Sequence, residues 1–176
     1  AITGEAAEKY VVDLQNVIKS ARAAFNNTPD LVGSIQRLLE ENAVYKKQAE
    51  EYARQKAQML ADELAGKAET LGEVKLIKLT ECEDAAMLRE AALALQKSQV
   101  GTALVAAYQI DGKPSLVLMY SADLVAAGKN AGKDIRNAAK FIMGGGGGQP
   151  GFASAGGKNP EGLSDALNAL IEAVKA

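Results

Sequence analysis

The chain has 176 residues, of which 48% are hydrophobic and 24% charged, and its formal net charge is −2. It has no histidine and one cysteine, Cys82, which excludes catalytic triads, imidazole acid–base chemistry, internal disulfides and Cys/His zinc sites. The lack of histidine argues against a catalytic centre, and the single cysteine fits a reducing cytoplasm. The length fits one or two domains. No apolar run approaches the roughly 20 residues that a membrane-spanning helix needs, so we expect no membrane partner.

Residues 1–70 are predicted to be helical throughout. Apolar residues recur every three or four positions over residues 5–24, and a turn signal at residues 26–29 precedes a second helix that runs to Gly66. Along the second helix the apolar spacing alternates between four and three, which is the heptad pattern of interdigitating helices. We call this stripe the seam; it consists of Leu31, Ile35, Leu38, Asn42, Tyr45, Ala49, Tyr52, Lys56 and Met59.

Three surfaces could bury the seam: the first helix, the rest of the chain, or a second copy of the chain. The second helix is much longer than the first, which leaves part of the seam uncovered. Asn42 and Lys56 place polar groups in the seam, where such groups fix register and partner number at a cost in stability. We therefore expect residues 31–60 to mediate homo-oligomerisation, with a simple intramolecular hairpin as the alternative.

From Leu71 onward the pattern changes to short apolar runs that alternate with helical periodicity. Strands are predicted at residues 74–79, 102–110 and 115–120. Helices are predicted at residues 83–97, 130–143 and 159–174. The chain is therefore predicted to have an α+β fold, with a long coiled-coil-like helical hairpin over residues 1–70 and a small mixed α/β globular domain over residues 71–176.

The segment Gly144–Gly157 reads GGGGGQPGFASAGG. An ordered glycine gives up more backbone entropy than any other residue, so such a run needs an explanation. A flexible linker is one alternative. However, apolar-periodic segments flank the run on both sides, and Phe152 interrupts it with a large apolar group. We expect an ordered glycine-rich loop that faces a ligand, with Phe152 as either a core anchor or a stacking surface.

The glycine run lies in the only basic part of the chain, because residues 101–160 carry six Lys and Arg against three Asp and Glu. Four cations are predicted to share one face of the helix that leads into the run, and Lys158 and Lys113 extend the positive surface. These four are Lys129, Lys133, Arg136 and Lys140. We expect a polyanion-binding face rather than a merely solvated one.

Two nucleotide-phosphate motifs do not fit the glycine run. A Walker loop requires Lys-Ser/Thr directly after the glycines, and Gln149-Pro150 stands there instead. A dinucleotide-binding fingerprint requires a strand before the glycines, where a helix is predicted. A folded nucleic acid recognised by its shape fits the pattern better.

These residues resemble the C-terminal domain of alanyl-tRNA synthetases. In that family a lysine-rich helix leads into a glycine run, an x-Pro pair, a Phe or Met followed by Ala, and a closing Ala-Gly-Gly-Lys-x-Pro. The matching residues are Asn130-Ala131-Gly132-Lys133, Gly144–Gly148, Gln149-Pro150, Phe152-Ala153 and Ala155-Gly156-Gly157-Lys158-Asn159-Pro160. The start of the chain, Ile2-Thr3-Gly4-Glu5-Ala6-Ala7 and then Tyr10, resembles the end of the family's editing module.

The resemblance implies a non-catalytic piece of a longer cytosolic alanine–tRNA ligase, beginning where the editing domain ends. It implies that the helical part self-associates. It also implies that the globular part, related to the DHH-associated domain of phosphoesterases, holds the outer corner of tRNA(Ala) and couples aminoacylation with editing. ATP, magnesium and the editing zinc belong to upstream parts of such an enzyme, so no cofactor is expected here.

The basic helix and the glycine run, taken together with this resemblance, predict which residues contact tRNA. They are Lys129, Asn130, Lys133, Arg136, Lys140, Gly144, Gly145, Gly146, Gly147, Gly148, Gln149 and Lys158. Asn130 stands where the family often has His, and Gln149 where it often has Arg, so this copy is less cationic. Two alternatives remain: the substrate-binding domain of a DHH-type phosphoesterase acting on oligonucleotides, and a purely structural coiled-coil module.

Overall fold

The computed structural model describes residues 4–176. Residues 1–3, which carry part of the resemblance to the end of an editing module, lie outside the described residues. The chain divides into two compact units, Ala1–Glu51 and Tyr52–Ala176. A helical N-terminal part followed by a mixed α/β domain confirms the predicted fold class. No helix among the described residues is long and apolar enough to cross a membrane.

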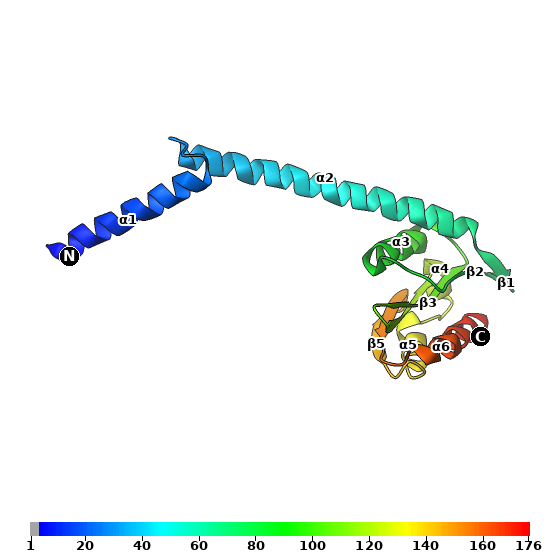
Figure 1. Cartoon of the computed structure of the whole chain (residues 1–176). Helices are drawn as coiled ribbons and strands as arrows, with labels where there is room; N and C mark the ends of the chain where they lie inside the picture. Colours follow the sequence, from blue (N-terminus) through cyan, green and yellow to red (C-terminus); the bar gives the residue numbers. More distant parts are fainter. Residues whose placement is uncertain (1–3) are drawn as a thin grey trace. The chain divides into compact units, whose positions relative to one another are not determined.

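The first unit holds α1, Glu5–Ala24, and the beginning of α2, Leu31–Gly66, which continues into the second unit (Figure 1). The Asp30 carboxylate caps α2 by accepting a hydrogen bond from the Gly33 amide at 2.9 Å. No residue from 4 to 51 is buried, and burial in α2 begins at Ala57. The apolar stripe of α1 and the seam of α2 therefore remain exposed, and the structure does not show the packed intramolecular hairpin.

The second unit is built on a six-stranded sheet with the order β1-β2-β3-β4-β6-β5. Its strands are β1 (Glu69–Leu71), β2 (Val74–Leu79), β3 (Thr102–Ile110), β4 (Lys113–Tyr120), β5 (Gly145–Gln149) and β6 (Phe152–Gly156). Only β2 and β3 pair in parallel, and the crossover between them is α3, Ala85–Ser98. All other neighbouring strands are antiparallel, and β5 forms one edge of the sheet.

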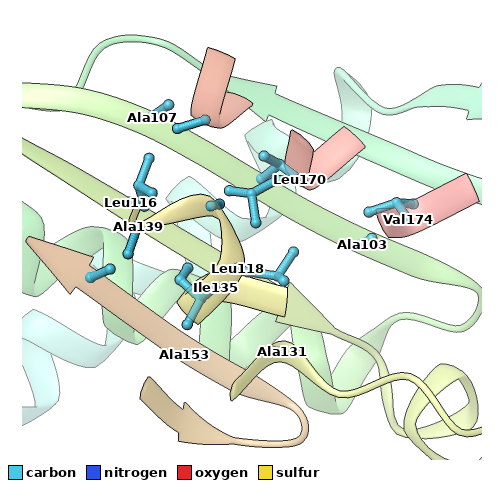
Figure 2. Packing of buried hydrophobic residues seen from close by; sticks show 14 of the residues in the cluster. Ala103, Ala107, Leu116, Leu118, Ala131, Ile135, Ala139, Ala153, Leu170 and Val174 are labelled. Atoms are coloured by element: carbon cyan, nitrogen blue, oxygen red, sulfur yellow. The ribbon is translucent and has the colours of Figure 1, made fainter. Parts of the chain in front are cut away.

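Helices cover both faces of this sheet, which explains why β3 is an almost continuous apolar run. Alternate residues of β3 face opposite layers. Leu104 packs in one core with α3 and the C-terminal turns of α2, and Val105 packs in the other with α5 and α6. Figure 2 shows the second core, where Ile135 of α5 and Leu170 of α6 lie against the sheet. The bounds are Ala131–Ala138 for α5, Leu163–Lys175 for α6 and Ala122–Ala126 for the short α4.

The glycine run is part of the sheet, which corrects the predicted loop. Gly145–Gln149 forms strand β5, and Phe152–Gly156 forms β6, paired antiparallel to it across a turn at residues 150–151. The helix before the run is also shorter than predicted. It ends at Ala138 instead of Met143, because the chain then turns and the Gly144 amide donates to the Ala139 carbonyl at 2.9 Å.

A buried tyrosine ties α5 to the sheet. Tyr120, at the end of β4, is fully buried, and its hydroxyl donates a hydrogen bond to Asp134 Oδ2 at 2.9 Å. Burial, and secondly the negative charge of Asp134, raise the pKa of Tyr120 far above its ordinary value. Tyr120 therefore stays protonated in the folded chain across the whole alkaline range in which an unfolded tyrosine ionises.

We predict that Tyr120→Phe lowers the free energy of unfolding by about 1–3 kcal/mol at pH 7, since the half-buried Asp134 loses a hydrogen bond. Above about pH 10 the unfolded state of the wild type releases the Tyr120 proton and the folded state keeps it, so stability falls as pH rises. In the variant this fall should be smaller, although Tyr108, whose pKa is also raised, preserves part of it. Urea unfolding at pH 7 to 11 measures both effects, and an unchanged pH dependence would contradict the assigned cause.

Candidate nucleic-acid interface

Helix α5 lies close to strand β5 because glycines meet where the two elements cross. The Asn130 side chain caps α5 by accepting a hydrogen bond from the Lys133 amide at 3.0 Å. Gly132 follows in the first turn and is buried against β5. A Cβ atom at Gly132 would lie only 2.7 Å from the Gly148 carbonyl oxygen. The close approach of this helix therefore requires glycine in the helix, and not only in the strand.

The glycines of the run fall into two groups. Cβ atoms at Gly144, Gly146 and Gly148 would collide with the main chain of β6 and the residue after it, so these three are needed for the strands to pair. A Cβ atom at Gly145 would meet nothing within 4 Å, and one at Gly147 would only make ordinary contact with a side chain. At these two positions the missing side chain leaves main chain accessible at the edge of the sheet.

The side chain beside Gly147 is a cation. A Cβ atom there would lie 3.6 Å from both Nε and Nη2 of Arg136, so the guanidinium lies directly beside the bare strand. Lys133 and Arg136 both belong to α5 and are exposed. The structure thus brings the basic helix and the glycine run together, although Arg136 and the first glycine of the run, Gly144, are eight residues apart in sequence.

The four cations do not share one helical face, which corrects the predicted stripe. Lys129 precedes α5, and its ammonium group donates hydrogen bonds to the Ala173 and Val174 carbonyls, both at 2.9 Å. These are among the last carbonyls of α6, which a cation is well placed to stabilise. Lys140 follows α5 in the turn and is exposed. Lys129 therefore holds α6 in place, and Lys133 and Arg136 are the members of the stripe that lie in α5.

The exposed cations near the glycine strand are not neutralised by carboxylates. None of the ion pairs found within residues 4–176 involves Lys133, Arg136, Lys140 or Lys158. The acid nearest in sequence, Asp134, accepts the hydrogen bond from Tyr120 and so faces the sheet. The positive potential around β5 is therefore available to an anionic ligand.

Side chains, rather than bare main chain, flank the turn between β5 and β6. Gln149 is exposed, and Phe152 is half-buried against the core beneath α3, so the structure favours the core-anchor interpretation of Phe152. Its ring is also covered by Arg89, whose guanidinium carbon lies 5.9 Å from the ring centroid. Sequence reasoning missed Arg89, because it stands beside Glu90 on a separate helix and no sequence pattern links it to the glycine run.

Comparison with known proteins agrees with the resemblance. Residues 73–176 match the DHHA1 domain, so the chain belongs to the DHHA1 domain family. It is 42% identical over 175 residues to an alanine–tRNA ligase of Parabacteroides distasonis and 38% identical over 173 residues to one of Bacteroides fragilis. These alignments cover 99% and 98% of this chain but 20% of each relative, so the chain spans about a fifth of their length.

A solved structure gives the same assignment. The C-Ala domain from Aquifex aeolicus alanyl-tRNA synthetase superposes with a TM-score of 0.55 and 27% sequence identity, covering 62% of this chain and 98% of that domain. The predicted resemblance to the C-terminal part of this family of ligases is therefore confirmed. Within residues 4–176, no group of three or more His, Cys, Asp or Glu side chains is placed to hold a metal ion.

The two groups of glycines can be told apart by substitution. We predict that Gly146→Ala lowers the free energy of unfolding by about 1–3 kcal/mol, because its Cβ would collide with the main chain at Ser154 and Ala155. Gly145→Ala is the matched control, with open space around its Cβ and an expected change within about 0.5 kcal/mol. Neither glycine has a positive φ. Urea unfolding compares the two, and equal effects would contradict the close approach of β5 to β6.

Proposed function

We propose that this chain is the tRNA-binding and oligomerisation part of an alanine–tRNA ligase and has no catalytic centre of its own. In this proposal residues 71–176 hold the outer corner of tRNA(Ala) and couple aminoacylation with editing in the cytoplasm. The names of the ligase relatives and the likeness to the C-Ala domain support tRNA as the ligand. The observation that supports this interface most directly is the Arg136 guanidinium beside the bare main chain of Gly147.

The proposed mechanism combines charge with close approach. Lys133, Arg136, Lys140 and Lys158 attract phosphate groups, and their contacts release counterions from the RNA. Strand β5 lies at the edge of the sheet, where one side of the strand has no partner strand for its N–H and C=O groups. Because Gly145 and Gly147 have no side chains, the phosphate backbone can reach the N–H groups on the unpaired side of β5 directly. Shape and charge, rather than base sequence, would then select the folded RNA.

Arg136→Ala and Lys133→Ala test the charged part of this interface. Each is expected to weaken binding of a tRNA(Ala) transcript and to reduce the slope of log K against log salt by about one, because one phosphate contact is lost. Lys97→Ala, which removes an exposed cation from the end of α3, should leave the slope unchanged. Filter binding at several salt concentrations gives the slopes. Slopes that match the wild type in both variants would remove these side chains from the interface.

The second half of the proposal is self-association through the seam of α2. Five seam side chains have exposed fractions between 38% and 72%: Ile35, Leu38, Tyr45, Tyr52 and Met59. Large apolar side chains repeated at heptad spacing on an exposed helix are typical of helices that pair along a seam. Because no residue from 4 to 51 is buried, the N-terminal unit itself leaves this surface uncovered. A second copy of the chain would bury it.

Tyr45→Glu tests the seam, because a carboxylate there would be buried between paired helices. We expect the wild-type chain to form a concentration-dependent oligomer in sedimentation equilibrium and the variant to stay monomeric. Val44→Glu is the matched control: Val44 is 54% exposed but lies one position along the helix, on a different face. A wild-type chain that remains monomeric at high concentration would exclude this half of the proposal.

A further inference from the structure

A hollow of about 450 Å³ lies at the end of the glycine strand opposite the hairpin turn. Three separate segments line it: residues 113–115 at the start of β4, residues 143–145 leading into β5, and residues 156–158 at the end of β6. Sheet register brings them together, since Gly156 pairs with Ser115 on one side and with Gly145 on the other. Its volume falls in the range of about 300–1,000 Å³ that is usual for small-ligand pockets.

The lining of the hollow is cationic. Lys113 and Lys158 both line it and are exposed, and no Asp or Glu is among the lining residues. Neither lysine takes part in an ion pair within residues 4–176. The Lys158 amide donates to the Ile142 carbonyl at 2.9 Å, which fixes the backbone that carries this side chain. Together with the half-buried Ser115, the two lysines offer donors to a phosphate group.

Met143 gives the hollow an apolar side and has an unusual backbone. Its φ is 49°, in the left-handed region that residues other than Gly, Asn and Asp rarely adopt, and its side chain is 71% exposed. Exposure leaves the thioether without an apolar partner, and the left-handed conformation adds strain. A methionine sulfur packs favourably against aromatic rings, including those of nucleobases. Four glycines make up much of the remaining wall, so the main chain can contact a flat ring closely.

We propose that this hollow binds one unstacked nucleotide of the RNA, with its phosphate between Lys113 and Lys158 and its base against Met143. This inference rests on the proposed function and deepens it, because it identifies a subsite of the same interface. A cationic rim and an apolar wall in a hollow of this size match the two halves of a nucleotide. Single-stranded or splayed bases are the parts of a folded RNA that proteins bind in this way.

The probe that tests the hollow directly is uridine 5′-monophosphate, compared with inorganic phosphate. The nucleotide should shift the amide resonances of the four lining glycines, Gly144, Gly145, Gly156 and Gly157, and should bind more tightly than phosphate. Lys113→Ala combined with Lys158→Ala should abolish both responses. Met143→Asn removes the thioether while keeping a residue that tolerates left-handed φ, and it should abolish only the difference between the two probes.

The same variants are then measured with the tRNA(Ala) transcript. The double lysine variant should reduce the salt slope by about one, because the two lysines share one phosphate contact. Met143→Asn should weaken binding about two- to tenfold without changing the slope, the range for a sulfur–aromatic contact. Val100→Asn is the control for Met143, since Val100 is also an exposed apolar residue, at 73%, and does not line the hollow. Urea unfolding of each variant verifies that the fold is retained.

The outcomes separate this inference from the proposed function. Equal binding of nucleotide and phosphate, unaffected by Met143→Asn, would overturn the role of the base. No response of the glycine resonances, with tRNA binding unchanged in the variants, would overturn the whole subsite and remove Lys158 from the interface, and the tRNA-binding proposal would then rest on Lys133, Arg136 and Lys140. A wild-type chain that does not bind tRNA would contradict the tRNA-binding half of the proposed function. The mononucleotide titration would still decide whether the hollow is a nucleotide site.

Discussion

The second unit depends on one steric condition, which is that strand β5 carries no side chains where it meets its neighbours. Gly146 and Gly148 pass so close to β6 that a single Cβ would collide with its main chain. Where α5 crosses β5, Gly132 brings the first turn of the helix within contact of the Gly148 carbonyl. Because these contacts are main chain to main chain, flexible side chains cannot absorb an added methyl group. The position of α5, and hence of Lys133 and Arg136, follows from this condition.

A glycine strand at the edge of a sheet is a costly arrangement. Glycine loses more conformational freedom on ordering than other residues and gives a strand no side chain to pack, and an uncovered edge invites pairing with another chain. Natural edges are often protected by charged side chains or by proline, and residues 144–148 contain neither. Here the protecting charge comes from a different element, because Arg136 of α5 lies beside Gly147. The edge that would be a hazard in another protein is thus positive, which favours a phosphate backbone over a neutral strand.

The sequence predicted the elements that have a clear local pattern, such as β3, where a nearly continuous apolar run marks a strand covered on both faces. It could not predict β5, because glycine has low strand propensity and the contacts that stabilise this strand come from β6 and α5. Helical spacing wrongly placed Lys129 on one helical face with Lys133, because Lys129 precedes α5. The partners of Lys129 are carbonyls 44 and 45 residues away, which no local pattern encodes. The end of α5 at Ala138 likewise depends on a turn closed by Gly144.

The glycine motif and the candidate binding surface do not coincide. The glycine motif is contiguous in sequence, and its residues divide in the fold between strand pairing and exposure to solvent. Lys113 lies about thirty residues before the motif, outside the predicted helical stripe, yet antiparallel pairing of β4 with β6 brings its neighbour Ser115 directly opposite Gly156. The candidate surface is assembled by sheet register. Its members are therefore found by following which strands pair, and the sequence motif supplies only the strand around which they gather.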